Sequence, residues 1–166
     1  MQLYILRHGI AVDRTTTAND SARPLTVEGR REMRENAKGM LALRLTFDTI
    51  LSSPYKRARE TAAVVADILK IKTRNILLTE NLVPEASFES LLKEIKTNLP
   101  KSDSILLVGH EPHLSGLISF LLIGRPSIAI NFKKSGLCCL SIEKLSGPGC
   151  ASLNWLLAPS QLRMIL

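Results

Sequence analysis

The first eleven residues, MQLYILRHGIA (1–11), place an arginine, a histidine and a glycine directly after a short apolar run. Leu3 to Leu6 are predicted to form a β-strand, because this run is short, apolar and followed by polar residues. Three later runs have the same character, at 48–51, 76–78 and 105–108. All four are typical of buried parallel strands, and longer segments of helical periodicity separate them. This alternation predicts an α/β layered fold.

Helices are expected between these strands. Thr26 is a suitable N-cap for one helix, and Ser53 followed by Pro54 predicts the start of another. A third helix is expected from Ser87, and a fourth after Pro112. The residues of the first two helices that are expected to face the core are Met33, Ala37, Met40, Leu41, Ala58, Ala62, Val65 and Leu69.

The C-terminal part of the chain has a different pattern. GLCCLSIEKL (136–145) and CASLNWLLAP (150–159) flank an SGPG turn and are predicted to form an antiparallel hairpin. The 166 residues fit a single domain, 1–166, with a substantial core. Three cysteines, an odd number without a metal-ligand spacing, are expected to be buried free thiols: Cys138, Cys139 and Cys150.

The composition excludes several classes of function. The net charge is +7, but the 22 lysines and arginines are scattered among 15 acidic residues, and aromatic residues make up only 4%. We therefore expect no nucleic-acid binding, whereas an acidic or phosphorylated partner fits the charge. No stretch approaches the roughly 20 apolar residues that span a bilayer, and the N-terminus lacks a signal-peptide pattern. We expect a cytoplasmic monomer that does not bind membranes.

Basic side chains are expected to meet at one edge of the sheet. Arg7 and His8 follow the first strand, and His110 follows the fourth. Arg57 lies in the first turn of the helix after the second strand, and Arg23 lies in the loop before the first long helix. Because ligands of open α/β sheets bind at the carboxyl ends of the strands, these side chains predict one shared site.

The residue types indicate phosphoryl chemistry. Guanidiniums supply planar donors for phosphoryl oxygens, and an imidazole nitrogen can attack phosphorus. A metal site is the weaker interpretation, because arginines repel a cation and the usual carboxylate ligands are missing. We therefore expect no metal and no cofactor, with a phosphate or sulfate ion able to occupy the site.

Three motifs carry a resemblance to a known family: LRHG (6–9), SSPYKRARET (52–61) and VGH (108–110). Together they resemble the histidine phosphatase superfamily, with the phosphoglycerate mutase-like fold, and RPLT (23–26) resembles its SixA-type phosphohistidine phosphatases. The resemblance implies three layers, α/β/α, with helices on both faces of a mostly parallel sheet. It also implies a phosphorylated nucleophile, His8, and a second histidine that stabilises charge, His110. The implied phosphate-binding arginines are Arg7, Arg57 and Arg23.

The resemblance also names a general acid. Many members of the superfamily use a carboxyl group beyond the third strand, and Glu80 is the matching candidate. The imidazole of phosphohistidine leaves more easily than an alkoxide, because its pKa is about 6.5. A site with a weak general acid therefore favours phosphohistidine substrates. The span from Glu80 to Ser104 holds one modest helix and no lid subdomain, which suits a phosphohistidine displayed on a protein. The implied partner is a histidine phosphotransfer domain or a related carrier.

Other interpretations remain open at this point. A small-molecule phosphatase acting on sugar phosphates or nucleotides is one alternative. A non-catalytic module that binds phosphate in the same pocket is another. Glu111 is as well explained by a surface or capping role as by a catalytic one, and His113 is expected in the first turn of a helix with a structural role.

Overall fold

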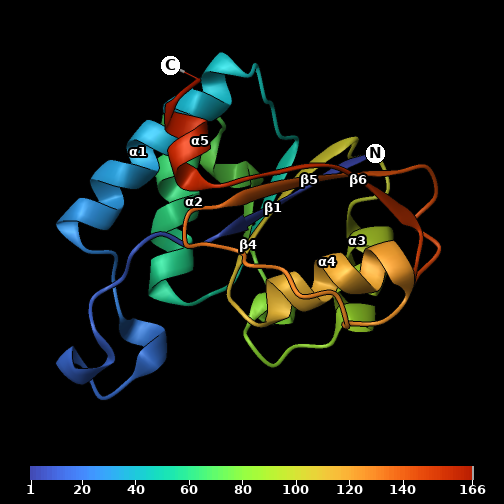
Figure 1. Ribbon diagram of the computed structural model, residues 1–166, viewed down its shortest axis with the longest axis horizontal. Helices are drawn as coiled ribbons and strands as arrows, with labels where there is room; N and C mark the ends of the chain where they lie inside the picture. The colour runs from blue at the N-terminus through green and yellow to red at the C-terminus, as the bar shows by residue number, and fades with distance from the viewer. Residues whose placement is uncertain (166) are drawn as a thin grey trace.

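A six-stranded sheet forms the middle layer of the computed structural model, which describes residues 1–165 (Figure 1). Its strand order is β3-β2-β4-β1-β5-β6. The strands are β1 (Gln2–Arg7), β2 (Thr49–Ser52), β3 (Ile76–Leu78), β4 (Ser104–Gly109), β5 (Leu137–Ile142) and β6 (Ala151–Leu157). The first four pair in parallel, while β5 runs antiparallel to both β1 and β6. The predicted mostly parallel sheet with a C-terminal hairpin is confirmed.

Helices cover both faces of this sheet. α1, α2 and α5 lie on one side, and α3 and α4 lie on the other (Figure 1). Their bounds are α1 (Val27–Ala42), α2 (Lys56–Leu69), α3 (Phe88–Asn98), α4 (His113–Ile123) and α5 (Pro159–Arg163). Four short 3₁₀ helices lie in the connections: η1 (Arg14–Thr16), η2 (Asp20–Ala22), η3 (Thr73–Asn75) and η4 (Glu80–Leu82). The three-layer α/β/α arrangement is therefore confirmed.

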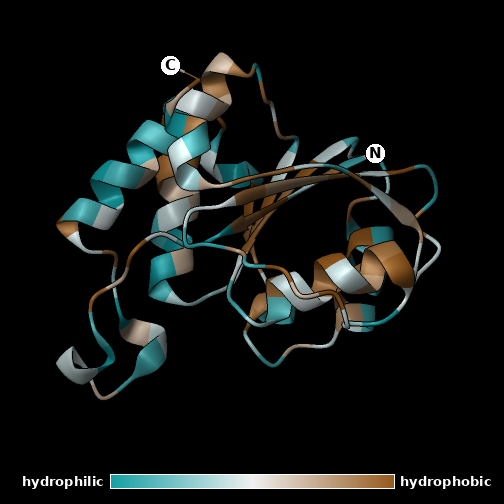
Figure 2. Ribbon diagram, in the orientation of Figure 1, coloured by the Kyte–Doolittle hydropathy of each residue, from teal (hydrophilic) through white to brown (hydrophobic). Residues whose placement is uncertain are grey.

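Each face of the sheet has its own hydrophobic core. Successive strand residues point to opposite faces, so Leu3 and Ile5 pack beneath α3 and α4, whereas Leu6 packs beneath α1 and α2. Figure 2 shows this layering, with hydrophobic strands in the middle and a hydrophilic outer surface on α1. Because β1 is a central strand with partners on both sides, its carboxyl end is held rigidly.

The predicted Thr26 cap of α1 and the expected start of α3 near Ser87 are confirmed. The side chain of Thr26 accepts a hydrogen bond from the Gly29 amide, and that of Ser87 accepts one from Ser90. The cysteines are free thiols, and of the three Cys150 is only half-buried. Within the described residues no helix is both long enough and apolar enough to cross a bilayer.

The prediction that Ser53 and Pro54 start α2 is wrong, because the helix begins at Lys56. The Ser53 amide instead donates to the carbonyl of Val108 at 2.9 Å, which continues the pairing of β2 with β4. Extending the strand by one residue moves the helix start toward Arg57. Arg57 nevertheless stays in the first turn of α2, as expected.

Two predictions of burial are also wrong. Leu41 is 51% exposed, because the core-facing stripe of α1 runs through its neighbour Met40 and leaves Leu41 to the side. In β3, Leu77 and Leu78 are 40% and 52% exposed. β3 is an edge strand, paired with β2 alone, so it lacks the second neighbour that buries a central strand.

Candidate active site

Two histidines meet where β1 and β4 end. Arg7 lies opposite Gly109 in the register of the two strands, and the His8 amide donates to the Gly109 carbonyl at 3.1 Å. The next residue along β4 is His110, and the centroids of the two imidazole rings lie 5.0 Å apart. Both histidines are buried. The predicted convergence of His8 and His110 at one sheet edge is thus a geometric fact of this structure.

The position of Gly9 fixes the direction of the chain after His8. Its amide donates to the hydroxyl of Thr61 at 3.0 Å, and this hydroxyl donates to the Arg57 carbonyl at 2.7 Å. A Cβ atom on Gly9 would lie only 3.2 Å from the side chain of Leu25. Thr61, which sequence reasoning missed, thereby ties the turn after His8 to the first turn of α2.

Hydrogen bonding defines the tautomer of His8. Its Nδ1 lies 2.7 Å from the Gly9 carbonyl oxygen, which can only accept, so Nδ1 carries the proton. Nε2 therefore carries a lone pair, and it accepts a 3.2 Å hydrogen bond from Nε of Arg57. The pKa of His8 is lowered to about 2, chiefly by burial and also by the neighbouring His110, Arg57 and Arg7, while the hydrogen bond to Gly9 acts in the opposite direction. The imidazole is neutral, with its lone pair directed at the arginine.

Arg57 is held by Asp20. The guanidinium is only 3% exposed, and its Nη1 donates to the Asp20 carbonyl at 2.7 Å while its Nη2 donates to Asp20 Oδ2 at 2.9 Å. Arg23 donates from Nε to Oδ1 of the same carboxylate at 2.9 Å and from Nη1 to the Val12 carbonyl at 2.8 Å. Sequence reasoning missed Asp20, although it stands three residues before Arg23.

Arg7 and His110 complete the basic cluster. Nη1 of Arg7 donates to the Phe132 carbonyl at 2.7 Å, while its buried Nε has no partner among the described residues. Nε2 of His110 lies 2.8 Å from the hydroxyl of Ser53. Burial lowers the pKa of His110 to about 3, helped by the charge of Arg57, so this imidazole is neutral as well.

These side chains line a cavity of about 950 Å³. Its walls bring together His8, His110, Arg7, Arg23 and Arg57, together with Arg14 and Lys134. Its lining residues also include Asp13, Asp20, Tyr55, Glu85 and Glu111. The guanidiniums that line this cavity supply planar donors for phosphoryl oxygens, so the cavity is suited to a phosphate-sized anion.

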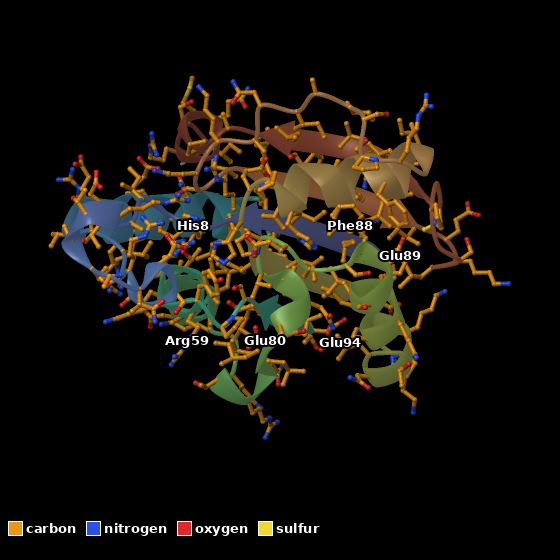
Figure 3. All side chains as sticks on the ribbon, turned by 90° about the horizontal axis from the view of Figure 1, so that it is seen from below. His8, Arg59, Glu80, Phe88, Glu89 and Glu94 are labelled. Carbon is orange, nitrogen blue, oxygen red and sulfur yellow. The ribbon has the colours of Figure 1, made fainter. Side chains whose placement is uncertain are left out.

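Glu80 is not among the residues that line the cavity. It is exposed on the 3₁₀ helix η4, beyond the edge strand, and Figure 3 shows it apart from His8. The glutamates that the structure brings to the cavity are instead Glu85 and Glu111. Glu111 accepts hydrogen bonds from the amide and the hydroxyl of Ser115, which is a capping role in the first turn of α4.

No group of three or more histidine, cysteine, aspartate or glutamate side chains within residues 1–165 is arranged to hold a metal ion. His113 lies in the first turn of α4, as expected, and packs against Phe88 with ring centroids 5.1 Å apart. It does not line the cavity that holds His8.

A neutral histidine that follows the first strand and lies among arginines is a site suited to phosphoryl transfer, in an α/β protein. Comparison with known proteins identifies the class of protein, since residues 3–82 match the family model of the histidine phosphatase superfamily (branch 1). Phosphohistidine phosphatase SixA of Escherichia coli is 31% identical over 166 residues, covering 99% of this chain and 98% of that protein. The chain belongs to the histidine phosphatase superfamily.

Other proteins are similar to this chain over most of its length. An uncharacterized protein of Picosynechococcus is 34% identical over 138 residues, covering 82% of each chain. The structure of the protein histidine phosphatase SixA complexed with tungstate superposes with a TM-score of 0.84 at 27% identity, covering 98% of this chain and 99% of that one. A phosphoserine phosphatase of Entamoeba histolytica shares the fold at 18% identity, with a TM-score of 0.67 and 97% and 98% of the two chains covered.

Proposed function

We propose that this protein is a phosphohistidine phosphatase, which removes phosphate from histidine on a partner protein through a phosphorylated His8. Phosphatase activity follows from membership of the superfamily and from the likeness to SixA. The observation that carries the finer proposal is that α3 (Phe88–Asn98) does not close over the cavity. The connection from β3 to β4 buries Leu91, Leu92 and Ile95 of α3 in the core, so this helix supports the sheet and does not close over the site.

In the proposed first step, Nε2 of His8 attacks phosphorus and the bond from phosphorus to the substrate nitrogen breaks. The neutral tautomer supports this role, because Nδ1 keeps its proton on the Gly9 carbonyl and the lone pair of Nε2 is released when Arg57 transfers its hydrogen bond to a phosphoryl oxygen. Arg7, Arg57 and Arg23 bind the phosphoryl oxygens, and His110 donates to them as charge develops. In the second step, water attacks the phosphorus on His8. Overall, one water supplies the proton on the released imidazole and the hydroxyl of the phosphate.

The leaving group explains how such a site can work without a carboxylic acid beside His8. The substrate imidazole has a pKa of about 6.5, so it departs near neutral pH without strong protonation by the enzyme. A sugar alkoxide needs a general acid, and Glu80 does not line the cavity. We therefore propose that Glu80 is dispensable for phosphohistidine hydrolysis.

The proposed partner is a histidine phosphotransfer domain of a phosphorelay or a related cytoplasmic carrier. Such a partner presents its phosphoimidazole on a protein surface, and the wide cavity can admit it. Arg14 and Lys134 lie in the cavity lining, where positive charge attracts an acidic partner and speeds encounter.

A substrate panel tests the proposal. Wild type, Glu80→Gln and Glu85→Gln are given a phosphorylated phosphotransfer domain, a sugar phosphate and a nucleotide. We expect rapid release of phosphate from the phosphoprotein, unchanged within about 3-fold in both variants, since a general acid would be worth 100-fold or more.

Two other results would assign other functions. Fast hydrolysis of the sugar phosphate that collapses in either glutamine variant would make the protein a small-molecule phosphatase. Tight phosphate binding without turnover of any substrate would make it a binding module. Glu85 in the cavity lining is the observation that keeps the first of these alternatives worth testing.

A further inference from the structure

Asp20 lies between Arg23 and Arg57 of the cavity, and its Oδ1 also lies 3.5 Å from Nε of the exposed Arg14. Its Oδ1 lies 2.9 Å from Nε and 2.8 Å from Nη2 of Arg23, and its Oδ2 lies 2.9 Å from Nη2 of Arg57. The backbone carbonyl of Asp20 accepts a further hydrogen bond, at 2.7 Å, from Nη1 of Arg57. Asp20 alone therefore accepts hydrogen bonds from Nη1 and Nη2 of Arg57 and from Nε and Nη2 of Arg23.

These contacts fix the plane of the Arg57 guanidinium. Asp20 holds Nη1 and Nη2, and the remaining nitrogen, Nε, donates to Nε2 of His8 at 3.2 Å. A phosphoryl group that binds at Nε2 must place its oxygens close to this same donor. The orientation that Asp20 imposes on Arg57 is therefore the orientation that phosphoryl transfer to His8 requires.

Asp20 also neutralises the charge of the Arg57 guanidinium. The Arg57 side chain is 3% exposed, and a buried guanidinium without a counterion is costly. Asp20 supplies that counterion from a more open position, since its own side chain is 40% exposed. Partial burial acts to raise the pKa of Asp20, but the hydrogen bonds and charges of Arg57 and Arg23 outweigh it and hold the pKa below its ordinary value. The carboxylate stays ionised at neutral pH.

We propose that Asp20 is a positioning residue that orients Arg57 and Arg23 toward a phosphoryl group at His8. The inference rests on the proposed function for the identity of the substrate, but its effect on anion binding can be measured without turnover. It gives Asp20 a role that its negative charge alone would not suggest.

Geometry and charge make opposite predictions for removal of this carboxylate. If Asp20 acted only through its charge, its loss would strengthen anion binding, because a negative group would leave the cavity. If it orients the arginines, loss of its carboxylate leaves Arg57 held only by the Asp20 carbonyl and His8, and Arg23 only by the Val12 carbonyl. Both guanidiniums are then oriented less firmly, and binding and turnover both weaken. Small misplacements of a catalytic group cost up to about 100-fold in rate.

The experiment compares Asp20→Ala and Asp20→Glu with wild type. Tungstate affinity is measured by calorimetry, and kcat and KM are measured with a phosphorylated phosphotransfer domain. We expect Asp20→Ala to lower kcat about 30-fold and to weaken tungstate binding about 5-fold, with Asp20→Glu restoring most of both. The matched control is Asp67→Asn, which removes a surface aspartate that lies 3.3 Å from Arg34, outside the cavity.

A double substitution tests whether Asp20 acts through Arg57. In an Arg57→Ala background, adding Asp20→Ala should lower kcat by no more than about 3-fold, because its main target is already gone. Fully multiplicative losses would overturn the inference, as would tighter tungstate binding by Asp20→Ala at unchanged kcat. If wild type fails to hydrolyse phosphohistidine, the proposed function fails, and the tungstate affinities still decide the role of Asp20.

Discussion

Arg57→Lys tests the site most sharply among single substitutions of its arginines. The substitution keeps a positive charge but replaces a planar fork with a single ammonium nitrogen. In the structure the guanidinium donates from Nε to His8 and from Nη1 and Nη2 to Asp20. A lysine at this position cannot satisfy three acceptors in that geometry and also contact a phosphoryl oxygen.

The expected effect can be estimated from the number of donors lost. Removing one preorganised donor to a developing oxyanion costs about 100-fold to 1,000-fold in kcat. Because the lysine retains the charge, we expect Arg57→Lys to lower kcat about 100-fold, with a smaller change in KM. Folding should suffer less, by about 1 kcal/mol, since Asp20 is partly exposed to water and can be solvated.

The appropriate assay is single-turnover hydrolysis of a phosphorylated histidine phosphotransfer domain, because it reports phosphoryl transfer without product release. Arg59→Lys is the matched control, since Arg59 is an exposed arginine on the same helix that does not line the cavity (Figure 3). An Arg57→Lys rate within about 3-fold of wild type, measured on folded protein, would refute the reasoning, because it would leave no room for a transition-state contact from the guanidinium.

Two further predictions concern the supports of the site and its titration. Thr61→Val leaves the Gly9 amide without its acceptor, so we expect the unfolding free energy to fall by about 1–3 kcal/mol and kcat to fall about 10-fold. Thr61→Ser, which keeps the hydroxyl, should stay close to wild type, and equal losses in both variants would contradict this prediction. The folded-state pKa values of His8, His110 and His113 are lowered to about 2, 3 and 4, so the unfolded chain binds more protons below its own histidine pKa of about 6.5. The free energy of unfolding should therefore be highest above pH 6.5 and fall from there toward pH 4, by up to about 1.4 kcal/mol per pH unit for each histidine. Urea midpoints that stay constant between pH 7.5 and 4.5 would show that these histidines are not kept neutral.

The layers of the fold and the centre of the site could be predicted from the sequence for one physical reason. Parallel strands bring their carboxyl ends to the same edge, so residues that directly follow two strands must meet. His8 and His110 follow β1 and β4, which are adjacent and in register, and their convergence needed no knowledge of the loops. The position of Arg57 was robust as well, because shifting the start of α2 by two residues leaves it in the first turn.

The contacts made by loops could not be predicted in the same way. Asp20 binds Arg57 across 37 positions of sequence, which depends on how the connection from β1 to α1 folds over α2. No periodicity in the sequence encodes that path. Glu80 follows β3, an edge strand that two other strands separate from β1. The convergence of strand ends therefore does not bring Glu80 next to His8. The candidate that the resemblance names therefore does not line the cavity.

The central claim is that phosphate passes through His8. The most direct measurement is rapid quenching of the wild-type protein mixed with a phosphotransfer domain carrying labelled phosphohistidine, followed by mapping of acid-labile label on the enzyme. The account predicts transient label on His8, decaying as free phosphate appears, and none on a folded His8→Ala variant. Release of phosphate at the wild-type rate by His8→Ala, or label mapped to another residue, would contradict it.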